Sequence, residues 1–224
     1  NQCQFSWFCD GRSDEPLDTK TWMESLTVAR DVMDGFYGDI TEGATHYHNV
    51  YVKMQDVVAQ TSNQTWSTYF NTKLRDRIGM SGSWIPVGDL SVYWSNTRSM
   101  ARFGLMTYAK GKWENTQIVP EAFLNEATNT SQSINLAYGY LWWLNGKPTF
   151  HLPQTQFEFS GSLIPNAPND MYAALGKNDQ KIYVVPSKKL VVIRMGDVAN
   201  PENPTFGLSG FDDELWQKIN ALTN

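Results

Sequence analysis

The 224-residue sequence has few charged residues and few cysteines and histidines. Charged residues make up 18% of the chain, and the net charge of −5 at pH 7 argues against nucleic acid as a partner. No apolar stretch reaches the roughly 18 residues that a membrane-spanning helix needs. There is no internal repeat, charge block or low-complexity linker. With a hydrophobic content of 41%, the sequence predicts a globular chain with room for one full domain, or for one domain and a small second one.

Two cysteines, Cys3 and Cys9, lie close together in an aromatic N-terminal segment. An even number of cysteines in a short loop is compatible with one disulfide and an oxidising envelope compartment. Two reduced and inert cysteines are the alternative, and no Cys-x-x-Cys zinc pattern is present. The sequence begins at Asn1 without a methionine, which predicts either a mature product or a fragment.

Three histidines are present: His46, His48 and His151. On a strand, the first two would point to one face, as a metal site requires. His151 lies far along the chain, and no carboxylate or cysteine stands out as a third ligand. We therefore expect structural hydrogen bonding for these histidines, with no metal and no cofactor.

Aromatic residues are abundant, with 9 Trp, 10 Tyr and 11 Phe. Such residues line sugar-binding and peptide-binding surfaces, but they also fill large cores, and we expect the core to take most of them. Apolar periodicity and capping residues predict helices at 17–35, 54–61, 65–77, 97–110 and 212–222. Pro120 is expected at the first position of a further helix. Residues 84–93 are expected to form a loop and a short strand, 138–143 a strand, and 151–168 a long loop suited to a lid or specificity role.

The clearest β pattern lies near the C-terminus, where short apolar and β-branched runs alternate with turn residues. It predicts an antiparallel sheet of residues 171–176, 181–186 and 190–195, with the helix 211–222 packed against it. The fold class is therefore α+β. Lys177 ends the first of these strands, where it is either an ordinary surface lysine or a side chain held rigidly at a sheet edge.

Several strings within residues 46–224 resemble the serine hydrolases related to class C β-lactamases and penicillin-binding proteins. The most specific is SMARFGLMTYAKGKWENTQIVPEAFL at 99–124. Ile78-Gly79-Met80 and the aromatic stretch 138–143 also match. The resemblance implies an antiparallel sheet flanked by helices, and acyl transfer on amide, ester or β-lactam carbonyls.

The same resemblance implies the site residues. Tyr47-His48-Asn49 fits the tyrosine-x-asparagine motif, and Lys177-Asn178-Asp179 fits the lysine-threonine-glycine motif at its first position. Tyr47 and Lys177 are then the implied catalytic residues. Asn49, Asn178 and Asp179 are the implied substrate-binding residues, with aspartate where the family has glycine.

The nucleophile motif, serine-x-x-lysine, has no match. None of the serines is followed by lysine three residues later, and Ser95 and Ser99 have arginine there. Arginine stays protonated near neutral pH and is a poor general base. We therefore expect that the chain as given does not form an acyl-enzyme.

Residues 1–48 resemble instead the SleB/CwlJ cell-wall hydrolases. The matching pieces are residues 4–7, 9–11 and 43–48, and the resemblance implies cleavage of peptidoglycan. Glu24 and Glu42 do not sit at that family's catalytic position, and we interpret Glu24 as a solvated helix residue. The two resemblances divide the chain into residues 1–45 and 46–224.

Three hypotheses about function follow. The chain is a β-lactamase-related serine hydrolase that is inactive in isolation, a SleB-like peptidoglycan hydrolase, or a non-catalytic binding protein built from hydrolase parts. The expected partner is a small molecule or a peptidoglycan peptide, and the expected location is the periplasm or the exterior of a bacterial cell. The sequence leaves the oligomeric state open.

Overall fold

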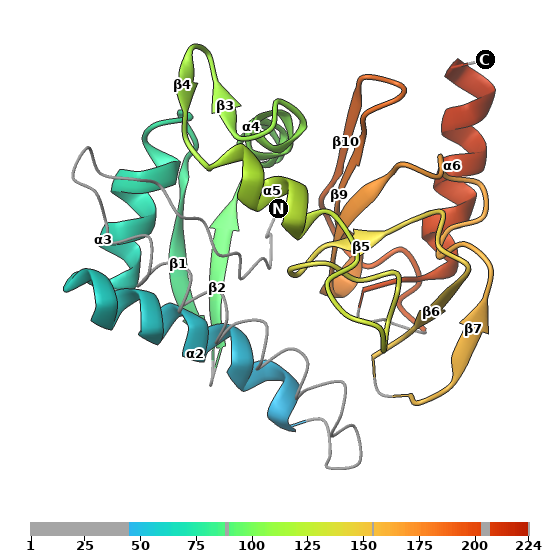
Figure 1. Ribbon diagram of the computed structural model, residues 1–224, viewed down its shortest axis with the longest axis horizontal. Coiled ribbons are helices and arrows are strands. Elements are labelled where there is room, and N and C mark those ends of the chain that lie inside the picture. The colour runs from blue at the N-terminus through green and yellow to red at the C-terminus, as the bar shows by residue number, and fades with distance from the viewer. Residues whose placement is uncertain (1–44, 88–89, 154, 203–206, 224) are drawn as a thin grey trace.

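A computed structural model describes residues 45–87, 90–153, 155–202 and 207–223, with the side chains of 52–222 within these ranges (Figure 1). Cys3, Cys9 and the predicted helix 17–35 lie outside the described residues. The helices are α2 (Thr45–Ser62), α3 (Trp66–Phe70), α4 (Thr97–Tyr108), α5 (Glu121–Ala127) and α6 (Gly210–Thr223). The strands are β1 (Gly82–Val87), β2 (Leu90–Ser95), β3 (Lys112–Trp113), β4 (Thr116–Gln117), β5 (Trp143–Leu144), β6 (Thr149–His151), β7 (Glu158–Ser160), β8 (Tyr172–Gly176), β9 (Gln180–Val185) and β10 (Leu190–Arg194).

The largest sheet among the described residues has the order β10-β9-β8-β5, and each neighbouring pair is antiparallel. It confirms the sheet and the α+β class that the β-branched runs predict. Strand β9 lies inside the sheet and is buried along its whole length, which explains why residues 182–185 are apolar or aromatic on both faces.

Helices cover both faces of this sheet. Ile182 and Val184 point into the same apolar cluster as α4, whereas Tyr183 and Val185 join the cluster that contains Trp216 of α6. Successive strand residues point to opposite faces, so α4 and α6 lie on opposite sides of the sheet (Figure 1). Helix α6 thus takes the predicted place against the sheet.

Helices α2 and α3 and the β1–β2 hairpin form the other half of the described molecule (Figure 1). Thr65 caps α3, which continues through a π-helical turn at Asn71–Arg75, and Asn96 caps α4. Both caps match the predicted helix starts. Pro120 is the N-cap of α5, one position before its predicted place.

The backbone of His46 and His48 is helical, in α2, so the strand geometry that would bring both histidines to one face is absent. Three local predictions are wrong. Residues 84–87 and 90–93, predicted as a loop and a short strand, belong to the paired strands β1 and β2. The stretch 138–143 is mainly irregular, with one isolated bridge from Tyr138 to Trp143, and the predicted loop 151–168 begins with the β6–β7 hairpin.

Candidate functional site

The predicted tripeptide Lys177-Asn178-Asp179 forms a short 3₁₀ turn between β8 and β9. Lys177 and Asn178 are exposed, whereas the side chain of Asp179 is 2% exposed. Asn178 and Asp179 have φ angles of 56° and 57°, in the left-handed region that non-glycine residues rarely adopt. The turn therefore holds two consecutive residues in an unusual backbone conformation.

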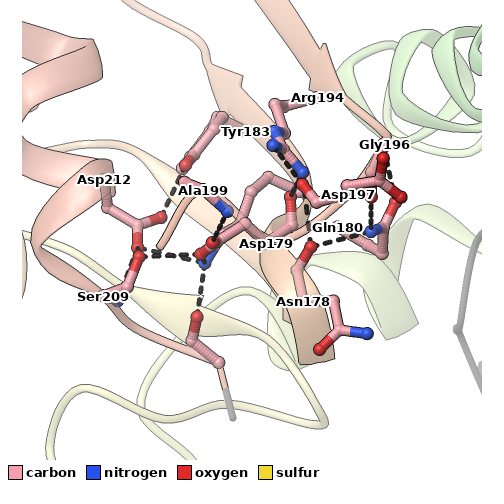
Figure 2. Close-up of polar contacts among 12 residues, drawn as sticks. Asn178, Asp179, Gln180, Tyr183, Arg194, Gly196, Asp197, Ala199, Ser209 and Asp212 are labelled. Atoms are coloured by element: carbon pink, nitrogen blue, oxygen red, sulfur yellow. Dashed lines mark hydrogen bonds and ion pairs between the residues drawn. The ribbon is translucent and has the colours of Figure 1, made fainter. Parts of the chain in front are cut away.

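The carboxylate of Asp179 points inward and is bound on both oxygens (Figure 2). Oδ1 accepts a hydrogen bond from Ser209 Oγ at 2.7 Å and lies 3.3 Å from Lys181 Nζ, and Oδ2 accepts from the Ala199 amide at 2.9 Å. Burial raises the pKa of Asp179. The hydrogen bonds from Ala199 and Ser209 and the charge of Lys181 outweigh burial, so the pKa lies below its ordinary value.

Lys181 is fully buried beneath the turn. Its Nζ lies 3.0 Å from Asp212 Oδ2 and also donates to the Gly207 carbonyl oxygen. Tyr183 donates from its hydroxyl to Asp212 Oδ1 at 2.5 Å. Burial, with the charge and hydrogen bond of Asp212, raises the pKa of the Tyr183 phenol, so Tyr183 stays a neutral donor.

We call these five side chains (Asp179, Lys181, Tyr183, Ser209 and Asp212) the Lys181 cluster. The lysine lies between two carboxylates, which supply the partners that a buried ammonium requires. Asp212 is also in the first turn of α6, where a negative charge is favourable. The cluster therefore joins the β8–β9 turn to the start of α6.

Polar side chains from two strands hold the backbone of the turn. Arg194 Nη1 donates to the carbonyl oxygens of Asn178 at 3.3 Å and Asp179 at 3.2 Å. Gln180 Nε2 donates to the Asn178 carbonyl oxygen at 2.8 Å and to that of Gly196 at 2.6 Å. In Figure 2 the side-chain amide of Asn178 points away from these contacts. The backbone of the turn is thus held by buried contacts, while the Asn178 side chain takes no part in them.

Sequence reasoning found the turn but not the network beneath it. Within the run from 180 to 185, Gln180 and Lys181 are the polar residues of a strand that is otherwise apolar. A lysine in a fully buried strand needs carboxylate partners. Lys181 in this apolar run therefore indicates a buried ion pair. Its partner Asp212 is 31 residues away in sequence, so spacing alone does not identify the pair.

The other predicted site residues, Tyr47 and Asn49, belong to α2. Their side chains lie outside the described part of the chain, so their approach to Lys177 stays a prediction. The substrate-binding role of Asp179 also stays a prediction. Its carboxylate contacts Lys181, Ser209 and the Ala199 amide.

The described serines near the predicted motifs have structural partners. Ser99 Oγ accepts from the Ser81 amide at 2.9 Å, and Asn96 Nδ2 donates to Ser81 Oγ at 2.8 Å. Ser187 donates to Asp170 at 2.7 Å in the turn between β9 and β10. These contacts cap a helix and close a turn, and none of them is the lysine or histidine contact that activates a nucleophile.

A small apolar cavity of about 20 Å³ lies between the two halves of the described molecule. It is lined by Phe70, Leu74, Met80, Trp84, Tyr93, Met100, Phe103 and Ile182. A volume of this size is close to what one water molecule requires. The cavity is therefore a packing feature and not a substrate pocket.

No three His, Cys, Asp or Glu side chains in the described ranges gather in a way that would hold a metal ion. Of the helices that the structure describes, none combines the length and the apolar character needed to cross a membrane.

The described residues have a β-lactamase-like fold. A protein from Bacillus anthracis named as a 6-aminohexanoate-dimer hydrolase has a TM-score of 0.54 at 15% identity, over 77% of this chain and 41% of its own. A protein from Bacteroides dorei named as a β-lactamase has a TM-score of 0.52 at 10% identity, over 78% and 56%. A penicillin-binding protein from Bacillus halodurans has a lower TM-score of 0.45 at 13% identity, over 78% and 53%. The chain spans only 41 to 56% of the length of these proteins.

The N-terminal part of the chain, residues 1–79, matches the family model described as Cell Wall Hydrolase. No curated protein matches the sequence. The matched range extends beyond the predicted boundary at residue 45, into α2 and α3. Val58, Trp66 and Leu74 share one apolar cluster with Phe103 and Ile182, so this part of the matched range packs into the same core as the sheet.

Proposed function

We propose that this protein is a β-lactamase-related serine hydrolase acting on amide, ester or β-lactam carbonyls, and that the turn at Lys177 binds the carboxylate of its substrate. One observation carries the proposal: an exposed lysine stands on a turn whose backbone is fixed by buried contacts. A positive group held on a rigid turn binds a carboxylate with little further loss of conformational entropy.

The residues have distinct proposed roles. Lys177 binds the substrate carboxylate and polarises the site, and the amides of Asn178 and Asn49 orient the ligand through hydrogen bonds. Tyr47 moves a proton to or from the reacting group. Asp179, the remaining residue of the turn, has its carboxylate buried beneath it.

The acyl step needs a serine whose proton is removed by a neighbouring base. The 224-residue sequence has no serine-x-x-lysine, and none of the serines described above contacts a lysine or histidine: Ser99 lies against Ser81, and Ser187 donates to the exposed carboxylate of Asp170. We therefore propose that the chain as given binds carboxylate-bearing ligands without being acylated. Its proposed ligands are peptidoglycan peptides, which fits the cell-wall hydrolase match, and its proposed location is periplasmic or secreted.

Binding of a synthetic N-acetylated stem peptide, measured by calorimetry, tests the carboxylate contact. Wild-type protein is expected to bind the peptide with a free C-terminal carboxylate about tenfold tighter than the C-terminal amide. Lys177→Met should reduce the affinity for the acid to that for the amide. Lys188→Met, an exposed lysine in the opposite hairpin turn, is the matched control and should leave both affinities unchanged. Equal binding of acid and amide by the wild type would overturn the proposal.

A second candidate function is direct cleavage of peptidoglycan by the N-terminal part, favoured by the family match over residues 1–79. Incubation of the protein with purified peptidoglycan, followed by assay of new reducing ends, tests this candidate. New reducing ends produced by the wild type would support it, and Glu24→Gln and Glu42→Gln, which do not sit at the family's catalytic position, should leave them unchanged. The absence of reducing ends from the wild-type digest would exclude it.

A further inference from the structure

We infer that Asp179 is a positioning residue, which shapes the Lys177 turn from inside and makes no contact with the ligand. The inference rests on the proposed function for the identity of the ligand. The shape of the turn itself follows from contacts within the described residues. Asp179 then supports Lys177 and Asn178 and does not bind the substrate.

The backbone supplies the first reason. Left-handed φ angles at Asn178 and Asp179 are ordinarily favourable only for glycine, with asparagine and aspartate the next most tolerant residues. A glycine at position 179 would reach this conformation without strain, but it would also leave the turn free to take others. Aspartate reaches the same conformation and adds a side chain that fixes it.

The direction of that side chain supplies the second reason. The carboxylate is buried and takes hydrogen bonds from Ser209 and Ala199 in the segment before α6, and it meets Lys181 on β9. No oxygen is left facing outward toward a ligand. Because the side chain leaves the outer face of the turn, aspartate adds no bulk beside Lys177 and Asn178 there.

The charges of the Lys181 cluster supply the third reason. Lys181 is shared between Asp179 and Asp212, at 3.3 and 3.0 Å. The carboxylate of Asp179 is therefore tied, through one buried ammonium, to the start of α6. A change at Ser209, which supports Asp179 from the segment before α6, should reach the turn through this connection.

Three variants separate positioning from direct contact. Asp179→Asn keeps a tolerant residue in the left-handed region and one oxygen toward Ser209 and Lys181. Asp179→Gly keeps the backbone conformation accessible but removes the carboxylate contacts to Ser209, Ala199 and Lys181, which we call the anchor. Ser209→Ala weakens the anchor by removing one of these contacts from outside the turn. Asp170→Gly is the matched control, because Asp170 accepts two hydrogen bonds from Ser187 in the turn at the opposite end of β9.

Affinity for the acid form of the stem peptide is the first readout. We expect Asp179→Asn to stay within about threefold of wild type and Asp179→Gly to lose about tenfold or more, with Ser209→Ala between them. Asp170→Gly should bind as the wild type does. Equal losses of affinity in Asp179→Asn and Asp179→Gly, with the exchange of the Gln180 amide unchanged in Asp179→Asn, would mean that the carboxylate itself meets the ligand. Unchanged affinity in Asp179→Gly would mean that the buried contacts of Asp179 are dispensable. Either result overturns the inference.

Amide hydrogen exchange without ligand is the second readout, and it separates failure of this inference from failure of the proposed function. The Gln180 amide donates to the Lys177 carbonyl oxygen and closes the turn. Its exchange should be faster in Asp179→Gly and Ser209→Ala, and unchanged in Asp170→Gly. If the wild type binds no stem peptide, the proposed function fails, and hydrogen exchange alone tests the positioning role of Asp179. Faster exchange of the Gln180 amide in the two variants supports that role, and unchanged exchange overturns it.

Discussion

At the scale of single residues, Lys181 has the most demanding environment among the described side chains. It is fully buried, and its ammonium is neutralised by Asp179 and Asp212 and by the Gly207 carbonyl oxygen. Removing one member of such an ion group leaves uncompensated charge in the interior, which costs more than the group contributes when it is intact. We therefore expect the conformation of the Lys177 turn to depend on Lys181, which is buried and contacts Asp179.

Lys181→Met tests this dependence. The substitution keeps much of the side-chain volume but leaves two buried carboxylates without their cation. We expect a loss of about 3–5 kcal/mol in the free energy of unfolding, measured by urea denaturation. Lys110→Met is the control, because the Lys110–Glu121 pair is exposed and should contribute less than about 1 kcal/mol. Equal losses in the two variants would contradict the account of the cluster.

At the scale of elements, the position of α4 on the sheet depends on a glycine. A Cβ atom at Gly104 would lie 2.6 Å from Val191 Cγ1 of β10 and 3.3 Å from Ile182 Cγ2 of β9. The first distance is too short for two carbon atoms, so either the Val191 side chain or the helix must shift to admit a side chain at position 104. Gly104 thus sets how closely the helix approaches the sheet.

Gly104→Val should destabilise the protein by about 1–3 kcal/mol, because it overpacks the contact between α4 and the sheet. Thermal denaturation followed by circular dichroism measures the effect. Leu105→Val, at an exposed neighbouring position of the same helix, should change stability by less than about 0.5 kcal/mol. A neutral Gly104→Val would mean that α4 is free to shift away from β10.

The sequence allowed prediction of those elements whose patterns arise from strong local physics. The apolar β-branched runs of β9 and β10 and the starts of α3 and α4 could be identified because burial and helix initiation each select distinct residue types. Strand β1 could not, since it is mostly exposed and contains proline and glycine. Its pairing with β2 is a property of the folded molecule.

In the candidate site, too, some features follow from the local sequence and others arise only in the folded chain. Lys177 and its turn follow from local sequence, but the support beneath them does not. Asp212 and Ser209 come from a segment about thirty residues further along the chain, and only the folded sheet brings them to Asp179. The inward direction of Asp179 likewise depends on its φ angle, which the residue type permits but does not dictate.

At the scale of the whole molecule, the described residues build a β-lactamase-like fold over 41 to 56% of the length of the similar structures. Residues 58–74 share a core with the sheet, although they fall within the range that matches the cell-wall hydrolase model. The predicted division of the chain at residue 45 stays a prediction. A division at residue 79 would separate side chains that pack together in one cluster.

The central claim is that this chain binds a carboxylate-bearing carbonyl ligand and is not acylated by it. Mass spectrometry of one sample with benzylpenicillin, recorded first under native and then under denaturing conditions, tests both parts. The account predicts a complex in the native spectrum that disappears on denaturation and leaves the unmodified mass, because an unactivated serine hydroxyl is a weak nucleophile. A stoichiometric adduct that survives denaturation, or the lack of any complex in the native spectrum, would contradict it.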